Sequence, residues 1–444
     1  MFQASDKILY LPVETAAREL DAKLLLALHA LRQGFEVVIG SHTRLNAMIH
    51  RMPRGLYLLH TFNRPRRRIV RIVSAAGHRI AAWDEEGLVW LSEEVYAKRR
   101  IDHQVLRHVS RIYAWGDQHA AALRRAGVQG DIRILGNPRA DLLRPELRGL
   151  HAEAARRLKE RHGDFILINS NFGWLNYALM PRNNADPETR LRALAERSGH
   201  PLDYLHYRQA VFDAFLELLP ILSREFPDRA IIVRPHPSES PEAWKVVTTG
   251  LPNVQVIYDS DLVAWLIAAG AMIHNGCTTA VEYALLDRVP LSFEPIRDAR
   301  YDSPQPRQVS VIAESPEEVC THIRHGLDRA RIRDALAHMV GGLDAPHLAA
   351  TAIAEDLRDL APEPARPSPR GALAGSLRAL EKRLASLSPR SSSSPAYLDK
   401  KFPDLGEREV AERLAVLAEA CGTGKKFSKV EKLSNRVFRV FRIM

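Results

Sequence analysis

Short apolar runs alternate along the chain with longer segments in which apolar residues recur every three or four positions. Residues 7–13, KILYLPV, have the length and composition of a buried strand. Residues 15–34 have helical spacing and stop at Gly34, and residues 35–41 indicate a second strand. This alternation predicts a parallel sheet covered by helices on both faces. Further strands of the first half are expected at 55–60, 78–83, 111–116 and 131–136.

The alternation begins again at residues 164–173, after a break near residues 150–163. The sequence therefore predicts an α/β protein with two Rossmann-like domains facing a cleft, plus a C-terminal helical extension. Ligands of such sheets bind at the carboxyl ends of the strands. The expected parts are an N-terminal acceptor and catalytic-base domain (1–155), a nucleotide-binding domain (156–360), a Pro/Ser-rich linker with one short basic helix (361–397) and a basic helical tail (398–444).

The last twenty residues, 425–444, carry seven basic residues and one acid. Apolar residues recur there at helical spacing, which predicts an amphipathic basic helix. Such a helix can lie in the interface of an anionic membrane, or it can dock on its own protein. The apolar positions are Val430, Leu433, Val437, Val440, Phe441 and Met444.

The net charge of +10 suits an anionic partner, but no nucleic-acid-binding module is recognised and nucleic acid is not expected. Three widely spaced cysteines without a CxxC pair favour a reducing compartment. The first residues do not read as a signal peptide, and no apolar run is long enough to span a bilayer. We therefore expect a cytoplasmic protein, peripheral on the inner face of the plasma membrane through residues 425–444.

Three consecutive carboxylates, Asp84, Glu85 and Glu86, stand before Gly87 at a predicted strand end. Neighbouring carboxylates raise one another's pKa, which suits a catalytic base, and Gly87 permits a tight turn. A solvated turn without catalytic function is the alternative interpretation.

The stretch VRPHPSES ends another predicted strand and holds His236 between two prolines. Pro237 and its partner stiffen the backbone on both sides of the imidazole. His236 can donate to a phosphate or to a leaving-group oxygen, or it can be an ordinary core histidine. Arg234 can bind a phosphate, or it can pair with a carboxylate as a structural salt bridge.

The stretch IHNGCTTAVEYALL reads as a strand, a turn at Asn275 and Gly276, and a helix capped by Thr278 or Thr279. The N-terminus of such a helix binds phosphate through its free N–H groups and its dipole. Glu282 can reach a ribose hydroxyl, or it can close the first turn as the capping-box partner of Thr279. Polar residues also end the strand at 164–173, where we include Asn169 and Asn171 as ligand-binding candidates.

Together these motifs carry a resemblance to bacterial sialyltransferases and related GT-B enzymes that use CMP-activated sugars. The matching elements are Glu85-Glu86-Gly87, His236-Pro237 and Thr278-Thr279. The chain more closely resembles the bacterial surface carbohydrate biosynthesis family, which is similar to the β-Kdo transferases. This likeness covers roughly residues 7–300 and the later KFPDL stretch. It is carried by DEEGLVWLSEEVY, WGDQHAAAL, LGNPRADLLRPELR, ILINSNFGWLN, RPHPSE and HNGCTTAVEYALL, together with the first predicted strand and helix.

The resemblance implies a GT-B-type glycosyltransferase that moves Kdo or a related 2-keto-sugar acid from a CMP-linked donor to a surface polysaccharide or lipid-linked acceptor. Glu85 or Glu86 would then be the catalytic carboxylate. His236 would contact the CMP phosphate, and Thr278 and Thr279 would hold it. No cofactor and no metal are expected.

Two other functions stay open at this point. A CDP-polyol phosphotransferase of the teichoic-acid type would need a second, well-placed histidine as its base. A non-catalytic polysaccharide assembly factor would use the basic tail and leave the site vestigial. If transfer proceeds with retention, a carboxylate nucleophile is needed as well, and the sequence does not rank Asp84, Asp141 and Asp203 for that role.

Overall fold

The computed structural model of the chain divides into two compact units. The first comprises Met1–Leu88, Glu93–Leu150 and Ala337–Met444, and the second comprises Val89–Ser92 and His151–Leu336. The residues that the structure describes are 7–443, except 174, 180–185, 237, 259–260, 327–331, 363–364, 386–393, 395–397, 400 and 425–427.

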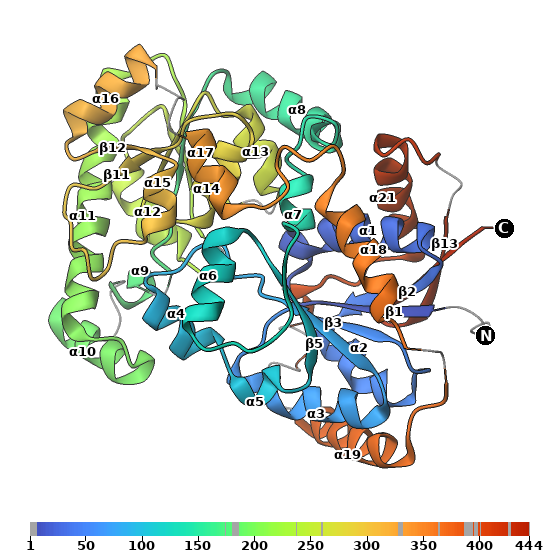
Figure 1. The fold of residues 1–444 in the computed structure, drawn as a ribbon. Coiled ribbons are helices and arrows are strands. Elements are labelled where there is room, and N and C mark those ends of the chain that lie inside the picture. The colour runs from blue at the N-terminus through green and yellow to red at the C-terminus, as the bar shows by residue number, and fades with distance from the viewer. Residues whose placement is uncertain are drawn as a thin grey trace. The chain divides into compact units, whose positions relative to one another are not determined.

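The sheet of the first unit has the strand order β13-β14-β2-β1-β3-β4-β5-β6 (Figure 1). Strands β1 to β6 are parallel, whereas β14 joins the β2 edge antiparallel and β13 pairs antiparallel with β14. The strands are β1 (Lys7–Val13), β2 (Phe35–Ser41), β3 (Leu56–Leu59), β4 (Arg79–Trp83), β5 (Val109–Ala114), β6 (Ile132–Ile134), β13 (Ser428–Ser434) and β14 (Val437–Arg442).

The helices of the first unit cover this sheet and one another. Helix α1 follows β1 directly and is covered by α18 and α21. Its Leu24–Leu28 run is therefore fully buried, although a surface helix would expose part of it. The helices are α1 (Ala16–Arg32), α2 (His42–Met48), α3 (Arg67–Ala76), α4 (Glu93–Arg100), α5 (His103–Leu106), α6 (Asp117–Arg125), α7 (Pro138–Asp141), α18 (Ala349–Leu360), α19 (Pro369–Ala385) and α21 (Glu407–Ala420), with short 3₁₀ turns η1 (Ile49–Arg51), η2 (Arg64–Arg66) and η3 (Arg148–His151).

The second unit is a six-stranded parallel sheet in the order β12-β11-β10-β7-β8-β9. Its strands are β7 (Ile166–Asn169), β8 (Ile231–Arg234), β9 (Val254–Val256), β10 (Ala271–His274), β11 (Leu291–Phe293) and β12 (Val311–Ala313). Its helices are α8 (Ala152–His162), α9 (Leu175–Leu179), α10 (Pro187–Ser198), α11 (Leu202–Glu225), α12 (Pro241–Thr248), α13 (Leu262–Ala268), α14 (Thr278–Leu285), α15 (Pro304–Gln308) and α16 (Pro316–His325), and α17 (Ile332–Met339) crosses the unit boundary.

Both sheets are therefore of the doubly wound, Rossmann-like kind, and the predicted α/β fold class with two such sheets is confirmed. In each sheet the strand order reverses once. The reversal falls between β1 and β3 in the first sheet and between β7 and β10 in the second. Ligands of doubly wound sheets bind in the crevice that opens at this reversal.

The prediction of a helical tail over residues 425–444 is wrong. Residues 428–442 form the β13–β14 hairpin, which turns at Arg436 with a φ of 63°. Of the apolar residues that suggested one face of a helix, Val430, Val437 and Val440 are buried in the sheet, whereas Leu433 and Phe441 are partly exposed. Met444 and residues 425–427 lie outside the described part of the chain.

Arginine recurs every third residue in the tail, at Arg436, Arg439 and Arg442, for a reason other than helical periodicity. Strand β14 is an inner strand that pairs with β2 and β13, and its successive residues are buried on both faces, Arg439 included. The guanidinium of Arg439 pairs with the buried carboxylate of Glu36 on β2, with one N–O distance of 2.8 Å. Arg439 is therefore part of a buried ion pair and does not face lipid. Residues 428–442 do not form the amphipathic helix on which the predicted membrane anchor at 425–444 was based.

The expected domain limits also differ from the observed units. Residues 337–360, which were assigned to the nucleotide-binding domain, belong to the first unit. The carboxylate of Asp141 accepts hydrogen bonds from the backbone N–H groups of Ala349 and Ala350, at 2.9 and 2.8 Å, and so holds the start of α18 against α7. The expected basic helix in the linker is α19, which packs along α3 (Figure 1). Within the described residues, no helix has both the length and the apolar composition to cross a bilayer.

We predict that Phe438→Ala lowers the free energy of unfolding of the first unit by about 3–5 kcal/mol, because it empties a buried position between α1 and the sheet edge. Phe441→Ala, in the same strand but only half buried, is the matched control and should cost clearly less. Urea denaturation followed by circular dichroism measures both. Equal small losses would show that the hairpin is not part of the folded sheet.

Candidate functional site

At the reversal in the first sheet, a carboxylate and an imidazole meet across the two strand ends. Glu14 follows β1 and His60 follows β3, and the Nε2 of His60 lies 3.1 Å from the Glu14 carboxylate. Arg66 adds a second hydrogen bond to the same carboxylate, at 3.0 Å. The hydrogen bond from His60 holds the pKa of Glu14 well below its usual range. The pair is therefore a neutral imidazole donating to an ionised carboxylate.

A second histidine lies beside this pair. The ring of His42, which follows β2, has its centroid 5.5 Å from that of His60. Burial lowers the pKa of His60 and lowers the pKa of His42 to about 3, so both rings are neutral at physiological pH. The Nδ1 atoms of both rings are buried and have no hydrogen-bond partner among the described residues. Each neutral ring has one N–H group and one unprotonated nitrogen, and the unprotonated nitrogen can accept a proton.

The loop after β4 places its three consecutive carboxylates in three different environments. Asp84 is fully buried, accepts from Tyr96 Oη at 3.0 Å and forms an ion pair with Arg100. Burial acts to raise the pKa of Asp84, but the charge of Arg100 holds it below its ordinary value. Asp84 is therefore an internal anchor of the loop, and its predicted catalytic role is not supported by its position.

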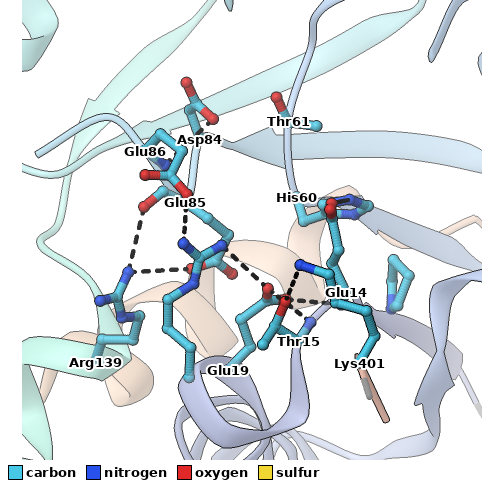
Figure 2. A network of polar contacts seen from close by, with 12 residues as sticks. Glu14, Thr15, Glu19, His60, Thr61, Asp84, Glu85, Glu86, Arg139 and Lys401 are labelled. Carbon is cyan, nitrogen blue, oxygen red and sulfur yellow. Dashed lines mark hydrogen bonds and ion pairs between the residues drawn. The ribbon is translucent and has the colours of Figure 1, made fainter. Parts of the chain in front are cut away.

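Glu85 is also buried, and its contacts tie the loop to α1. Its carboxylate accepts from Trp83 Nε1 at 2.9 Å and lies 3.1 Å from the ammonium of Lys23. Lys23 is 1% exposed and binds Glu19 at 2.7 Å. Burial acts to lower the pKa of Lys23, but Glu19 and Glu85 together keep it above its ordinary value. The Arg139 guanidinium lies 3.8 Å from the other oxygen of Glu85 (Figure 2).

Glu86 is the carboxylate of this loop that solvent reaches. Its side chain is 42% exposed and forms an ion pair with Arg18 on α1. Arg18 lies one residue before Glu19, whose carboxylate accepts from the backbone N–H groups of Glu14 and Thr15 at 3.0 and 3.1 Å. The same turn of chain therefore positions both Glu86 and the Glu14–His60 pair.

Gly87 is required for a close approach. A Cβ added there would lie 2.3 Å from the ring of His119. His119 Nδ1 accepts from the Trp115 backbone N–H at 3.2 Å, so its Nε2–H is free to donate to Tyr96 Oη, 2.8 Å away. Tyr96 in turn donates to Asp84. The glycine and the WGDQHAAAL segment thus serve one purpose, which is to fix the loop.

At the reversal in the second sheet, the structure brings several predicted residues together. Asn169 ends β7 and donates from Nδ2 to Thr279 Oγ1 at 2.7 Å, while Arg234, at the end of β8, lies 3.4 Å from its Oδ1. Asn171 Nδ2 lies 3.5 Å from the carbonyl of Gly276, which makes its turn with a φ of 79°. These contacts join the ends of β7, β8 and β10 into one polar surface.

Asn275 is the least satisfied polar group of this surface. Its side chain is 8% exposed, and neither its amide oxygen nor its amide nitrogen has a hydrogen-bond partner in the described structure. It lies two residues before Cys277, the N-cap of α14, which makes no side-chain capping hydrogen bond. A buried amide without partners costs free energy unless a ligand or water satisfies it, and a helix N-terminus attracts anions. The arrangement can hold a phosphate group.

The start of α14 differs in detail from the prediction. Cys277 occupies the N-cap position, and Thr278 and Thr279 are the first two helical residues, so neither threonine is the cap. Glu282 lies too far along the helix to be the capping-box partner, because that position, N3, is Ala280. Thr279 bonds Asn169 instead, and Thr278 is half exposed at the helix tip.

His236 is exposed at the end of β8, and its Nδ1 is held by the hydroxyl of Ser238 at 2.7 Å. The loop is anchored by a buried residue whose role the sequence did not reveal, Glu239. That carboxylate accepts from Ser170 Oγ and the backbone N–H groups of Phe172 and His236, at 2.9, 2.9 and 3.2 Å. Pro237 lies outside the described residues.

Two carboxylates considered as nucleophiles are engaged elsewhere. Asp203 is exposed on α11 and binds Arg300 and Tyr301. Asp141 holds the start of α18, and burial raises its pKa to about 6. No group of three or more potential metal ligands is found among the described residues. A pocket of 510 Å³ in the second unit lies at the amino end of β10 and β11, lined in part by Arg288 and His322, and so does not belong to this site.

Comparison with known proteins finds matches among solved structures, at low identity. No family model and no curated protein matches it. A variant of the wall teichoic acid polymerase TagF, soaked with CDPG, is 11% identical over 69% of this chain and 71% of its own, with a TM-score of 0.42. UDP-GlcNAc 2-epimerase from Neisseria meningitidis, bound to UDP-GlcNAc, is 12% identical over 80% of this chain and all of its own, with a TM-score of 0.48.

The epimerase from Methanocaldococcus jannaschii is similar to the same degree, with 12% identity, 79% and 99% coverage, and a TM-score of 0.47. Similarity at this level does not show which substrate this chain uses or what its residues do. Evidence on the function of this chain therefore comes from the residues at its own strand ends.

We predict that the two adjacent glutamates differ sharply in their effect on stability. Glu85→Gln should lower the free energy of unfolding by about 1.5–3 kcal/mol, because the buried Lys23 loses a charged partner. Glu86→Gln removes a half-exposed pair and should cost about 0–1 kcal/mol. Urea denaturation followed by tryptophan fluorescence compares them, and equal losses would contradict this assignment.

Proposed function

We propose that the protein is a transferase of bacterial surface glycan synthesis that uses a cytidine-nucleotide-activated donor. The preferred reaction moves a 2-keto-sugar acid, Kdo or a relative, from CMP to a polysaccharide or lipid-linked acceptor. The observation that carries the proposal is the unsatisfied, buried Asn275 amide at the N-terminus of α14, beside the polar ends of β7 and β8.

The second unit would hold the donor phosphate. The first-turn N–H groups of α14 and its dipole attract an anion, and Asn275 supplies a further donor. His236 lies exposed in the loop after β8, and Arg234 adds a buried positive charge at the same sheet edge. Donors placed on the departing phosphate stabilise the charge that develops as CMP leaves. In the proposed reaction, protein groups stabilise this charge and no metal is needed.

The first unit would supply the base. All three carboxylates are ion-paired, but Asp84 and Glu85 are buried whereas solvent reaches Glu86, so we assign the catalytic role to Glu86. Glu86 would take the proton of the acceptor hydroxyl while that oxygen bonds to the anomeric carbon and the bond from this carbon to the phosphate oxygen breaks. Asp84 and Glu85 keep a positioning role, because they fix the loop that carries Glu86.

A second candidate reaction has a specific observation in its favour. A CDP-polyol phosphotransferase needs a histidine base, and the first sheet has the neutral His42 and His60 beside Glu14 at its strand reversal. One imidazole would accept the proton of the acceptor hydroxyl as that oxygen bonds to the β-phosphorus of the donor and CMP leaves. Both candidates therefore share a CMP leaving group and differ in the base.

The proposed acceptors include lipid-linked glycans, so a position at the inner face of the membrane belongs to the same proposal. The β13–β14 hairpin does not support it through an amphipathic helix, because its apolar residues are in the sheet.

We predict that CMP binds to the protein and that Asn275→Ala and His236→Ala each weaken binding by roughly 10- to 100-fold, the loss expected for a hydrogen bond to a charged group. Isothermal titration calorimetry measures the affinity. His206→Ala, an exposed histidine on α11 of the same unit, is the matched control and should bind as the unchanged protein does. Unchanged affinity in both site variants would remove the phosphate site.

Turnover with CMP-Kdo, other CMP-sugars and CDP-glycerol separates the candidate functions. If sugar transfer is the reaction, Glu86→Gln should slow it by about 10²–10⁴-fold, with CMP affinity unchanged. If the polyol phosphate is transferred, His60→Gln should cause the larger loss and Glu86→Gln a small one. Binding of CMP without turnover of any donor would favour the non-catalytic assembly factor.

A further inference from the structure

Helix α19 is oriented with its small residues inward and its large apolar residues outward. Gly371 and Gly375 are buried, and a Cβ added to them would lie 2.3 Å from the Ala76 backbone and 2.1 Å from the His50 Cβ. The helix therefore docks on α3 and η1 through its glycines, at a distance that no larger residue allows.

The opposite face of α19 carries a stripe of leucines. At 100° per residue, positions 373, 377, 380 and 384 fall within a narrow arc, and the two glycines fall on the other side of the helix. We call these four residues the leucine stripe: Leu373, Leu377, Leu380 and Leu384 are 66%, 56%, 56% and 61% exposed. A contiguous row of exposed leucines marks a surface that another apolar phase covers.

The surroundings of the leucine stripe are strongly basic. Arg370 and Arg383 are exposed and flank the stripe on the helix surface. The neighbouring segment 64–71, RPRRRIVR, has five arginines and no acid, and Arg64 and Arg71 in it are exposed. Glu381, the one acid of α19, is already matched by Arg68 of α3, with an N–O distance of 2.7 Å.

Positive charges crowd one another at the C-terminal half of the helix. Besides partial burial, the nearby Arg378, Arg68 and Arg66 lower the pKa of Lys382. Two copies of this face brought together would oppose cation to cation. An anionic surface would instead neutralise the excess charge while it accepts the leucines, which is the composition of an interfacial membrane-binding helix.

We propose that the leucine stripe of α19, with the arginines of α19 and of segment 64–71, is a docking surface for an anionic lipid membrane. The leucines enter the headgroup–acyl boundary and the arginines contact the anionic headgroups. The first unit would thereby rest on the bilayer without a spanning segment. This inference stands apart from the proposed transfer reaction, because vesicle binding needs no donor and no turnover.

Flotation of the full chain with phosphatidylglycerol-containing vesicles tests it. The protein should co-float at low salt, should float far less with pure phosphatidylcholine, and should dissociate as salt rises. Arg64→Gln with Arg71→Gln should weaken binding about 25-fold, from about five-fold for each charge near the surface. Leu377→Gln with Leu380→Gln should weaken it by about ten-fold or more for each leucine.

Val246→Gln and Val416→Gln are the matched controls, since they replace exposed apolar residues on α12 and α21. They should float as the unchanged protein does. Circular dichroism and urea denaturation confirm that the leucine and arginine variants keep their fold. Equal flotation of the leucine variant, or no flotation of the unchanged protein, overturns the proposal. So does a dimer in sedimentation analysis that the leucine variant converts to a monomer, because a second copy would then cover the stripe.

Discussion

The arrangement of the first unit's strand ends depends on one buried ammonium group. Lys23 donates to the Pro12 carbonyl and to Glu19, and it pairs with Glu85. A buried charge is tolerated only when its partners are fixed, so this one cation holds together the end of β1, the first turn of α1 and the loop after β4. The solvent-reachable Glu86 owes its place to this internal contact.

In the second unit a buried carboxylate fixes the loops at the strand ends, as the buried ammonium of Lys23 does in the first unit. Glu239 is 1% exposed and accepts from the loop after β7, from the backbone of His236 and from the indole of Trp244 at 2.9 Å. Burial raises its pKa, whereas these donors lower it. In both sheets a buried ionisable side chain shapes the loops at the strand reversal, and Glu86 and His236, to which we assign roles in the proposed reaction, face solvent.

Apolar periodicity was sufficient to locate strands β1 to β8 and β10, but not β12, β13 or β14, and to predict that polar residues at strand ends would gather, as Asn169 and Arg234 do. It could not rank Asp84, Glu85 and Glu86, because their burial depends on Lys23 and Arg100, which come from distant segments. The Glu14–His60 contact was missed although each residue follows a predicted strand. Their meeting requires β1 to lie beside β3, and strand order is not written in local periodicity.

The helix predicted for residues 425–444 was wrong for a related reason. A strand covered on both faces loses the alternation that identifies strands, and VFRVFR then imitates a helix. The signal that remained was the turn at Asn435–Arg436 between two apolar runs.

The β13–β14 hairpin also dictates an order of events during synthesis. The second unit's main segment, His151–Leu336, is continuous, so it can fold while the ribosome is still translating. The first sheet must wait, and until residues 437–442 emerge β2 is a bare edge whose backbone groups invite pairing with other nascent chains. The late strand therefore closes an aggregation-prone edge.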